Sequence, residues 1–200
     1  MIKTIIFDIG GVLVNVSFEK CFRKYTSDET IIARLFQATL HGPIWKEFDR
    51  GVLTDEELTK KFMEQDPEIG ELIRDVVNDL GELVDLRDYA IPWIEELKEK
   101  GYQVLYLSNW PREFHKKFYH EMRFIPYTDG GILSYIEKVI KPEPEIYELL
   151  MNRYGLEAKE CVFLDDSANN LVTAKELGMQ TILYTDQEHA INELETMGVL

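Results

Sequence analysis

The chain has 200 residues, of which 45% are hydrophobic, which is enough for one buried core or a core with a smaller appended unit. Its formal net charge of −15 argues against nucleic acids and anionic membranes as partners, because an acidic surface repels both. The two cysteines, Cys21 and Cys161, are too few for a disulfide framework or a zinc site.

The sequence shows neither a secretory signal before its first apolar run nor an uncharged apolar stretch long enough to span a bilayer. We therefore expect a soluble, cytoplasmic protein.

The first predicted element is a buried β-strand over residues 2–7, followed at once by Asp8 and the glycine pair Gly10-Gly11. A carboxylate at the mouth of a buried strand needs a partner charge or a metal. Taken alone, however, Asp8 is more simply explained as a cap of the following turn.

The pattern recurs at two later strands, and the repetition favours a single site over three unrelated turns. A predicted strand over 102–107 ends in Ser108-Asn109, and another over 161–164 ends in Asp165-Asp166. Each predicted strand therefore ends in polar residues that can bind a ligand.

The segment from 15 to 86 contains helical patterns and no convincing strand. Apolar residues recur at helical spacing, and Thr54 with Glu57 forms a capping box at the start of one helix. Helices inserted directly after the first strand are expected to form a lid above the carboxyl edge of the sheet. The alternative is that they form one half of a helical core.

After residue 86, predicted strands alternate with amphipathic helices over 88–100, 144–154 and 168–177, and a further strand is predicted over 180–184. This alternation is typical of crossover units and a parallel sheet. In such sheets ligands bind at the carboxyl ends of the strands, where Asp8, Ser108 and Asp165 fall.

Four motifs occur in order at residues 8–13, 107–109, 140–147 and 163–170. Together they resemble the motifs of the haloacid dehalogenase-like hydrolase superfamily, in the branch with a helical cap between the first and second motifs. The chain looks most like the small bacterial glucose-1-phosphatase-type members. The resemblance implies an α/β fold with a Rossmann-like parallel sheet, helices on both faces and an inserted helical cap. Residues 1–14 and 87–200 would form the core, and 15–86 the cap.

The resemblance also implies a reaction and a metal. Asp8 would attack phosphorus and form an aspartyl-phosphate, which splits hydrolysis into two easier steps. Mg²⁺ would be held by Asp8, the main-chain carbonyl of Gly10 and Asp166, with Asp165 ligating directly or through water. From the residues alone, Asp165 and Asp166 can also be read as an N-cap pair for the following helix.

Phosphate binding is expected from three further residues. Ser108 can donate its hydroxyl and Asn109 a backbone N–H, although the pair can also be a simple turn with an N-cap. Lys141 would contact both the nucleophile and the phosphate in a member of the family, whereas a lone lysine is usually a solvated surface residue. The expected substrate is a small phosphorylated metabolite such as a sugar phosphate.

One position departs from the pattern of the related phosphatases. They carry a second Asp two residues after the nucleophile as general acid and base, and here that position is Gly10. Loss of such a group costs a factor of about 10²–10⁴ in rate. We favour a leaving group that needs little protonation, such as an anomeric oxygen or an acyl phosphate. The alternatives are a replacement from His41, Glu47 or Asp49, or slow or absent hydrolysis.

The substrate wall is expected in the inserted helices, where Trp45, Glu47 and Asp49 could contact a sugar, although a plain helical core with a charged face explains them equally well. Two other functions stay open. A 2-haloacid dehalogenase also uses a lone Asp, but lacks the paired acids seen at Asp165-Asp166. A degenerate domain that only binds a phosphorylated ligand or a protein partner is supported mainly by Gly10.

Overall fold

The computed structural model describes residues 1–199 and contains a five-stranded, fully parallel sheet with the order β5-β4-β1-β6-β7. The strands are β1 (Thr4–Phe7), β4 (Gln103–Ser108), β5 (Gly131–Leu133), β6 (Cys161–Asp165) and β7 (Gln180–Leu183). The predicted α/β class and the four predicted strands are confirmed. β5 was not predicted, because three residues are too few to show a strand periodicity.

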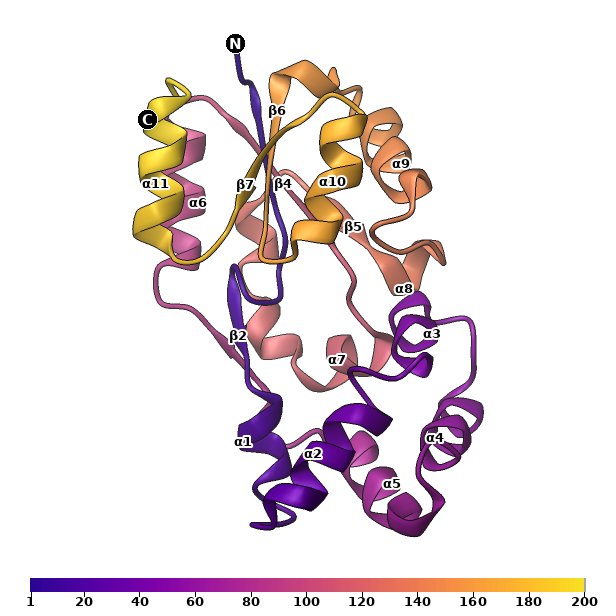
Figure 1. The fold of residues 1–200 in the computed structure, drawn as a ribbon. Helices are drawn as coiled ribbons and strands as arrows, with labels where there is room; N and C mark the ends of the chain where they lie inside the picture. Colours follow the sequence, from indigo (N-terminus) through magenta and orange to yellow (C-terminus); the bar gives the residue numbers. More distant parts are fainter. Residues whose placement is uncertain (200) are drawn as a thin grey trace.

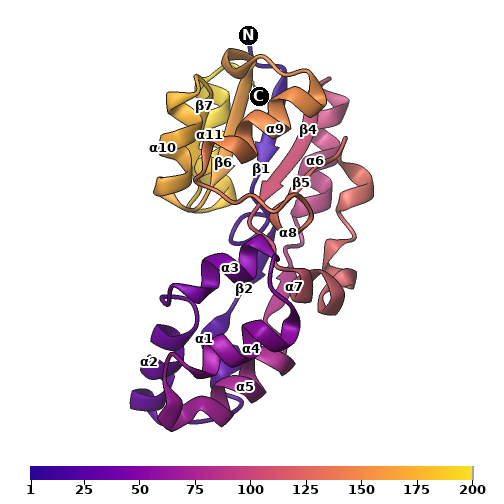
Figure 2. The same ribbon diagram turned by 90° about the vertical axis from the view of Figure 1, so that its right-hand side faces the viewer.

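Helices cover both faces of this sheet (Figures 1 and 2). One face packs against α6 (Ala90–Glu99) and α11 (Gln187–Thr196), and the other against α9 (Pro144–Tyr154) and α10 (Ala168–Glu176). Successive residues of β1 alternate between the two cores, with Ile5 in the first and Ile6 in the second. Burial on both sides explains why the strands read as continuous apolar runs.

The inserted helices α1–α5 form a separate group beyond the carboxyl edge of the sheet (Figure 1). They are α1 (Phe18–Phe22), α2 (Glu29–Ala38), α3 (Ile44–Arg50), α4 (Asp55–Met63) and α5 (Gly70–Asp79), with a short 3₁₀ turn η1 (Pro67–Ile69) before α5. The predicted capping box is present, since Thr54 N donates to Glu57 Oε2 at 2.9 Å and Glu57 N donates to Thr54 Oγ1 at 3.2 Å.

The expectation that residues 15–86 contain no strand was wrong at the two ends of this segment. β2 (Val14–Val16) and β3 (Val84–Leu86) pair antiparallel, with Val14 opposite Leu86 and Val16 opposite Val84. They form because the segment that leaves the sheet after β1 runs next to the segment that returns to it before α6. A short local sequence pattern does not predict such a long-range pairing. This two-stranded ribbon connects the inserted helices to the sheet.

The remaining elements lie between β4 and β6 along the chain. They are α7 (Arg112–Lys117), η2 (Tyr119–Met122), η3 (Ile125–Tyr127), α8 (Ser134–Glu137) and η4 (Ala158–Glu160). Phe114 of α7 packs edge-on against Trp45 and Phe48 of α3, which joins the inserted helices to this region. Within residues 1–199, every helix is too short or too polar to cross a membrane.

Candidate active site

The polar ends of the three central strands meet at one point. β1 lies between β4 and β6, with Phe7 opposite Tyr106 on one side and Leu164 on the other. The residues that follow these strands are therefore neighbours in space. Lys141 lies between two of them, with Nζ 2.9 Å from Asp8 Oδ1 and 2.6 Å from Asp165 Oδ2.

This ion-paired group is almost completely buried, with exposures of 7% for Asp8, 2% for Lys141 and 0% for Asp165. Burial alone would lower the pKa of Lys141, but the attraction of Asp165 and Asp8 outweighs it and raises that pKa. Lys141 therefore stays charged although it is surrounded by protein. It is not the solvated surface lysine that the sequence left open.

The loop that carries Lys141 is fixed by the side chain of Asn109. Asn109 Nδ2 donates to the carbonyl oxygen of Lys141 at 3.0 Å, and Lys141 N donates to Asn109 Oδ1 at 2.8 Å. Both polar atoms of this amide thus contact the lysine backbone. The expected contact of Asn109 with phosphate concerns its backbone N–H and stays a prediction, as does the contact of the Ser108 hydroxyl.

Asp165 accepts hydrogen bonds at both of its oxygens. Its Oδ1 accepts from Ser167 N at 2.7 Å, and Asn170 Nδ2 donates to both oxygens at 3.0 Å, in addition to the contact with Lys141. Asn170 was not predicted as a site residue, although it stands in the fourth motif one helical turn after Asp166. These contacts fix the Asp165 carboxylate beside Lys141. Its direct or water-mediated contact with a metal stays a prediction.

The carboxylates of Asp8, Asp165 and Asp166 form a cluster that suits a divalent cation, with one oxygen of each within 4.8 Å of the others. Burial raises the pKa of Asp8 to about 7; Lys141 opposes this shift, and the charges of Asp165 and Asp166 add to it. Three mutually repelling carboxylates are stabilised by a cation, and oxygen ligands are those that Mg²⁺ prefers. The residues present therefore fit Mg²⁺.

Gly11 allows Asp166 to approach this cluster. Its backbone has φ +76°, and a Cβ atom added there would overlap the Asp166 carboxylate. Any other residue would have to displace the third acid of the cluster. The role of the neighbouring Gly10 carbonyl as a metal ligand stays a prediction.

A cavity of about 530 Å³ opens above this cluster, between the sheet edge and the inserted helices. Its polar side is formed by Asp8, Ser108, Asn109, Asp166 and Ser167, and the aromatic part of its wall by Phe18, Trp45, Trp110 and Phe114. Trp110 was missed in the sequence, where its position directly after Ser108-Asn109 was the available signal.

The three acid or base candidates in the inserted helices differ in where they lie. Asp49 lines the cavity and is 7% exposed. Glu47 lies outside the lining, half-exposed and 3.9 Å from the Nε of Arg50. His41 is exposed and stacks on Phe36. Of the expected substrate residues, Trp45 and Asp49 therefore line the cavity and Glu47 does not.

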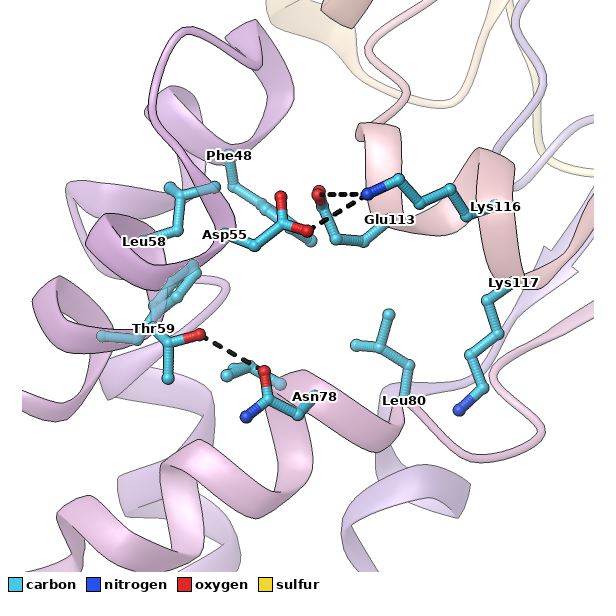
Figure 3. Close-up of a pocket in the computed structure, with 11 residues that line it drawn as sticks. Phe48, Asp55, Leu58, Thr59, Asn78, Leu80, Glu113, Lys116 and Lys117 are labelled. Carbon is cyan, nitrogen blue, oxygen red and sulfur yellow. Dashed lines mark hydrogen bonds and ion pairs between the residues drawn. The ribbon is translucent and has the colours of Figure 1, made fainter.

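A second cavity of about 290 Å³ lies between α4, α5 and α7, lined by residues such as Leu58, Thr59, Asn78 and Lys117 (Figure 3). Asp55 and Lys116 pair at its rim with an O–N distance of 3.1 Å. Its lining includes no residue of the four motifs. Residues of the first, second and fourth motifs line the cavity above Asp8 instead.

Comparison with known proteins agrees with this geometry. A family model described as haloacid dehalogenase-like hydrolase matches residues 2–178. D-ribitol-5-phosphate phosphatase of Bacteroides thetaiotaomicron is 28% identical over 197 residues, covering 90% of this chain and 91% of that protein. Mouse acyl-CoA dehydrogenase family member 10 is 29% identical over 208 residues, covering 98% of this chain, but the match spans only 19% of that longer protein.

Solved structures share the fold over nearly the whole chain. A haloacid dehalogenase family enzyme of Bacteroides thetaiotaomicron, in complex with magnesium and inorganic phosphate, has a TM-score of 0.70 and 29% identity, covering 95% of this chain and 99% of that chain. L-2-haloacid dehalogenase from Xanthobacter autotrophicus has a TM-score of 0.67 and 20% identity, covering 100% and 85%, which establishes likeness of fold alone. With the family model matching most of its length, the chain belongs to the haloacid dehalogenase-like hydrolase family, a family of enzymes.

Proposed function

We propose that this protein is a Mg²⁺-dependent phosphomonoesterase in which Asp8 is the nucleophile and residues 15–86 act as a cap over a core of 1–14 and 87–200. The observation that carries the proposal is the arrangement around Asp8. Its carboxylate is paired with a buried lysine on one side and clustered with two further acids on the other. This combination provides a nucleophile that lines the cavity, a buried cation in contact with it and a group of acids able to hold a metal.

In the first step of the proposed reaction, the nucleophile and the phosphate-binding groups are different residues. Asp8 attacks phosphorus to form an aspartyl-phosphate, while Lys141, Ser108 and the backbone of Asn109 hold the phosphate oxygens. Bound Mg²⁺ would supply the positive charge that lets a phosphate dianion approach a carboxylate. Asp8, Asp166 and the Gly10 carbonyl would hold this ion, with Asp165 beside them.

The cavity supports a small phosphorylated metabolite as substrate. Its aromatic wall, which includes Trp45, suits the apolar face of a sugar, and Asp49 offers a polar contact to a hydroxyl group. Relatives named as D-ribitol-5-phosphate phosphatase and as a sesquiterpene phosphatase support phosphate ester chemistry and differ in the group attached to phosphate. A sugar phosphate is the substrate that we propose.

The experiment is phosphate release from sugar 1-phosphates, sugar 6-phosphates, acyl phosphates and an aryl phosphate, each with Mg²⁺ and with EDTA. Asp8→Asn is the control, because it keeps the shape of the nucleophile and removes its charge. We expect turnover that needs both Mg²⁺ and Asp8. Absence of turnover on the whole panel would refute a phosphomonoesterase for these substrate classes.

The same samples distinguish the two alternative functions. Halide release from 2-chloropropionate, unaffected by EDTA, would identify a dehalogenase. A rise in melting temperature with Mg²⁺ and beryllium fluoride, without any turnover, would identify a domain that binds phosphate without hydrolysing it.

A further inference from the structure

The cavity above Asp8 contains an acid that the metal cluster does not use. Gly10 lacks the carboxyl group that the related phosphatases carry two residues after the nucleophile. A leaving group that needs protonation would therefore have to take its proton from another residue of the lining. Among the residues that line this cavity, the carboxyl groups are those of Asp8, Asp166 and Asp49. The first two belong to the metal cluster. Asp49 is left.

We propose that Asp49, on helix α3 of the cap, is the general acid and base of this enzyme and takes the place of the carboxyl group missing at Gly10. The inference rests on the proposed phosphatase function and assigns to the cap a part in the reaction itself. It also changes the expectation from the sequence, which favoured a leaving group that needs little protonation.

The backbone of Asp49 is held by the core. Ser134 Oγ donates to the carbonyl oxygen of Asp49 at 2.6 Å. Arg112 Nη2 and Lys138 Nζ donate to the carbonyl oxygen of the next residue but one, Gly51, at 2.7 and 2.5 Å. These contacts fix the last turn of α3, and hence the start of the Asp49 side chain, relative to the sheet edge. Such fixed placement is what proton transfer in a transition state requires.

The helix end can approach the core so closely because of Gly51. It has φ +65°, and a Cβ atom there would lie 2.9 Å from the Cβ of Tyr135 in α8. The glycine therefore ends α3 and brings the preceding turn against the core. The sequence predicted neither the hydrogen bonds to the Asp49 and Gly51 carbonyls nor the close approach of Gly51 to Tyr135.

The Asp49 carboxyl group is available for proton transfer. Within residues 1–199 no donor is hydrogen-bonded to its side chain, whereas both oxygens of Asp165 are occupied. Burial raises the pKa of Asp49 to about 8; Lys141 lowers it, and Asp8 raises it further. The cationic groups near this helix end have other partners. Arg50 is paired with Glu143, and Arg112 and Lys138 donate hydrogen bonds to the Gly51 carbonyl.

The two steps of the reaction then balance. As the bond from Asp8 to phosphorus forms, the bond from phosphorus to the leaving oxygen breaks, and that oxygen takes the proton of Asp49. The alcohol leaves and Asp49 is a carboxylate. It next removes a proton from the attacking water, whose oxygen displaces Asp8 from phosphorus. Inorganic phosphate is released, and Asp8 and Asp49 return to their starting states.

The test is Asp49→Asn, which preserves the shape of the side chain and removes its ionisable proton. It is assayed on an alkyl phosphate, such as a sugar 6-phosphate, and on p-nitrophenyl phosphate, whose leaving group needs no protonation. We expect kcat on the alkyl phosphate to fall by about 10²–10⁴. On the aryl phosphate, the burst of nitrophenol in the first turnover should stay within about tenfold of wild type, while the steady-state rate falls because the second step lacks its base.

The controls separate this role from a structural one. Asp49→Glu should restore part of the alkyl phosphatase activity, and Glu56→Gln, at an exposed acid of α4, should match wild type. Equal loss of burst and steady-state rates on both substrates would overturn the inference and make Asp49 a structural residue. So would full activity of Asp49→Asn on the alkyl phosphate. Inactivity of the wild type would instead refute the proposed function itself.

Discussion

Arg50 of helix α3 and Glu143, directly before helix α9, form a bidentate ion pair, with Nη1 2.9 Å from Oε2 and Nη2 2.6 Å from Oε1. Glu143 stands two residues after Lys141, and Arg50 stands next to Asp49. One pair of side chains therefore connects the segment that holds the buried lysine with the helix that carries the proposed acid. Planar bidentate geometry of this kind is specific to arginine.

The first prediction concerns this pair. Arg50→Lys keeps the charge and loses the bidentate geometry of the guanidinium group. We therefore expect helix α3 to be less well placed and kcat/KM to fall about tenfold. The melting temperature should change little, because partly exposed ion pairs contribute on the order of 0–1 kcal/mol. Steady-state kinetics and a thermal melt measure the two effects. Glu143→Gln should resemble Arg50→Lys, and the double variant should be no worse than either, whereas additive losses would show that the two side chains act separately.

A second prediction follows from the burial of Lys141. Lys141→Met keeps most of the side-chain volume but leaves Asp8 and Asp165 as buried carboxylates without their cation. Removing one partner of a buried ion pair costs about 3–5 kcal/mol, so the free energy of unfolding should drop by that order. Urea denaturation at neutral pH measures it. The paired change Lys141→Met with Asp165→Asn should recover part of the loss, and a single variant as stable as wild type would contradict the charge assignment.

The third prediction concerns Gly11 and the metal site. Gly11→Ala forces the Asp166 carboxylate to move, because a Cβ atom would overlap it. We expect Mg²⁺ affinity to fall at least about tenfold, within the range seen when groups that orient metal ligands are lost. The shift in melting temperature across a Mg²⁺ titration reports this directly.

Gly155→Ala is the matched control for Gly11→Ala. Gly155 also has a positive φ, +64°, but space for a Cβ atom is open there, with no neighbour within 4 Å. It therefore carries the backbone strain without the clash, and its Mg²⁺ affinity should equal that of wild type. Equal affinity in both variants would show that Gly11 does not determine the position of Asp166.

The fourth prediction is a pH dependence of stability without metal. The pKa of Asp49 is raised by burial to about 8 in the folded protein, above the ordinary value of 3.8. Between these values the folded state holds a proton that the unfolded state has lost. Because the folded state binds more protons, the free energy of unfolding decreases as pH rises through this window.

Asp49→Asn cannot ionise and should lack this contribution. Melting temperatures in EDTA from pH 5 to pH 9 should therefore fall less for Asp49→Asn than for wild type, with the two curves diverging as pH rises. Asp8 contributes in the same direction to both proteins, since burial raises its pKa to about 7. Parallel curves would mean that Asp49 is already solvated and ionised in the folded state.

Much of the fold was predictable because its signals are local. Burial on both faces makes a parallel strand a continuous apolar run, and the helices between strands show their own periodicity and caps. Since parallel strands end at one edge, polar residues after residues 2–7, 102–107 and 161–164 had to be neighbours in space. The sequence by itself therefore determined the α/β class and the meeting of Asp8, Ser108 and Asp165.

Tertiary structure decided which of the remaining polar side chains belong to the site. Glu47 and Asp49 are two residues apart on one helix, and only the direction from which α3 meets the core buries Asp49 in the cavity and leaves Glu47 half-exposed outside it. Likewise, Asn109 turns its amide to the backbone of Lys141, a partner 32 residues away. Periodicity tells which face of a helix is buried, but the cavity that the face meets depends on long-range packing, and that packing selects the residues able to share a reaction.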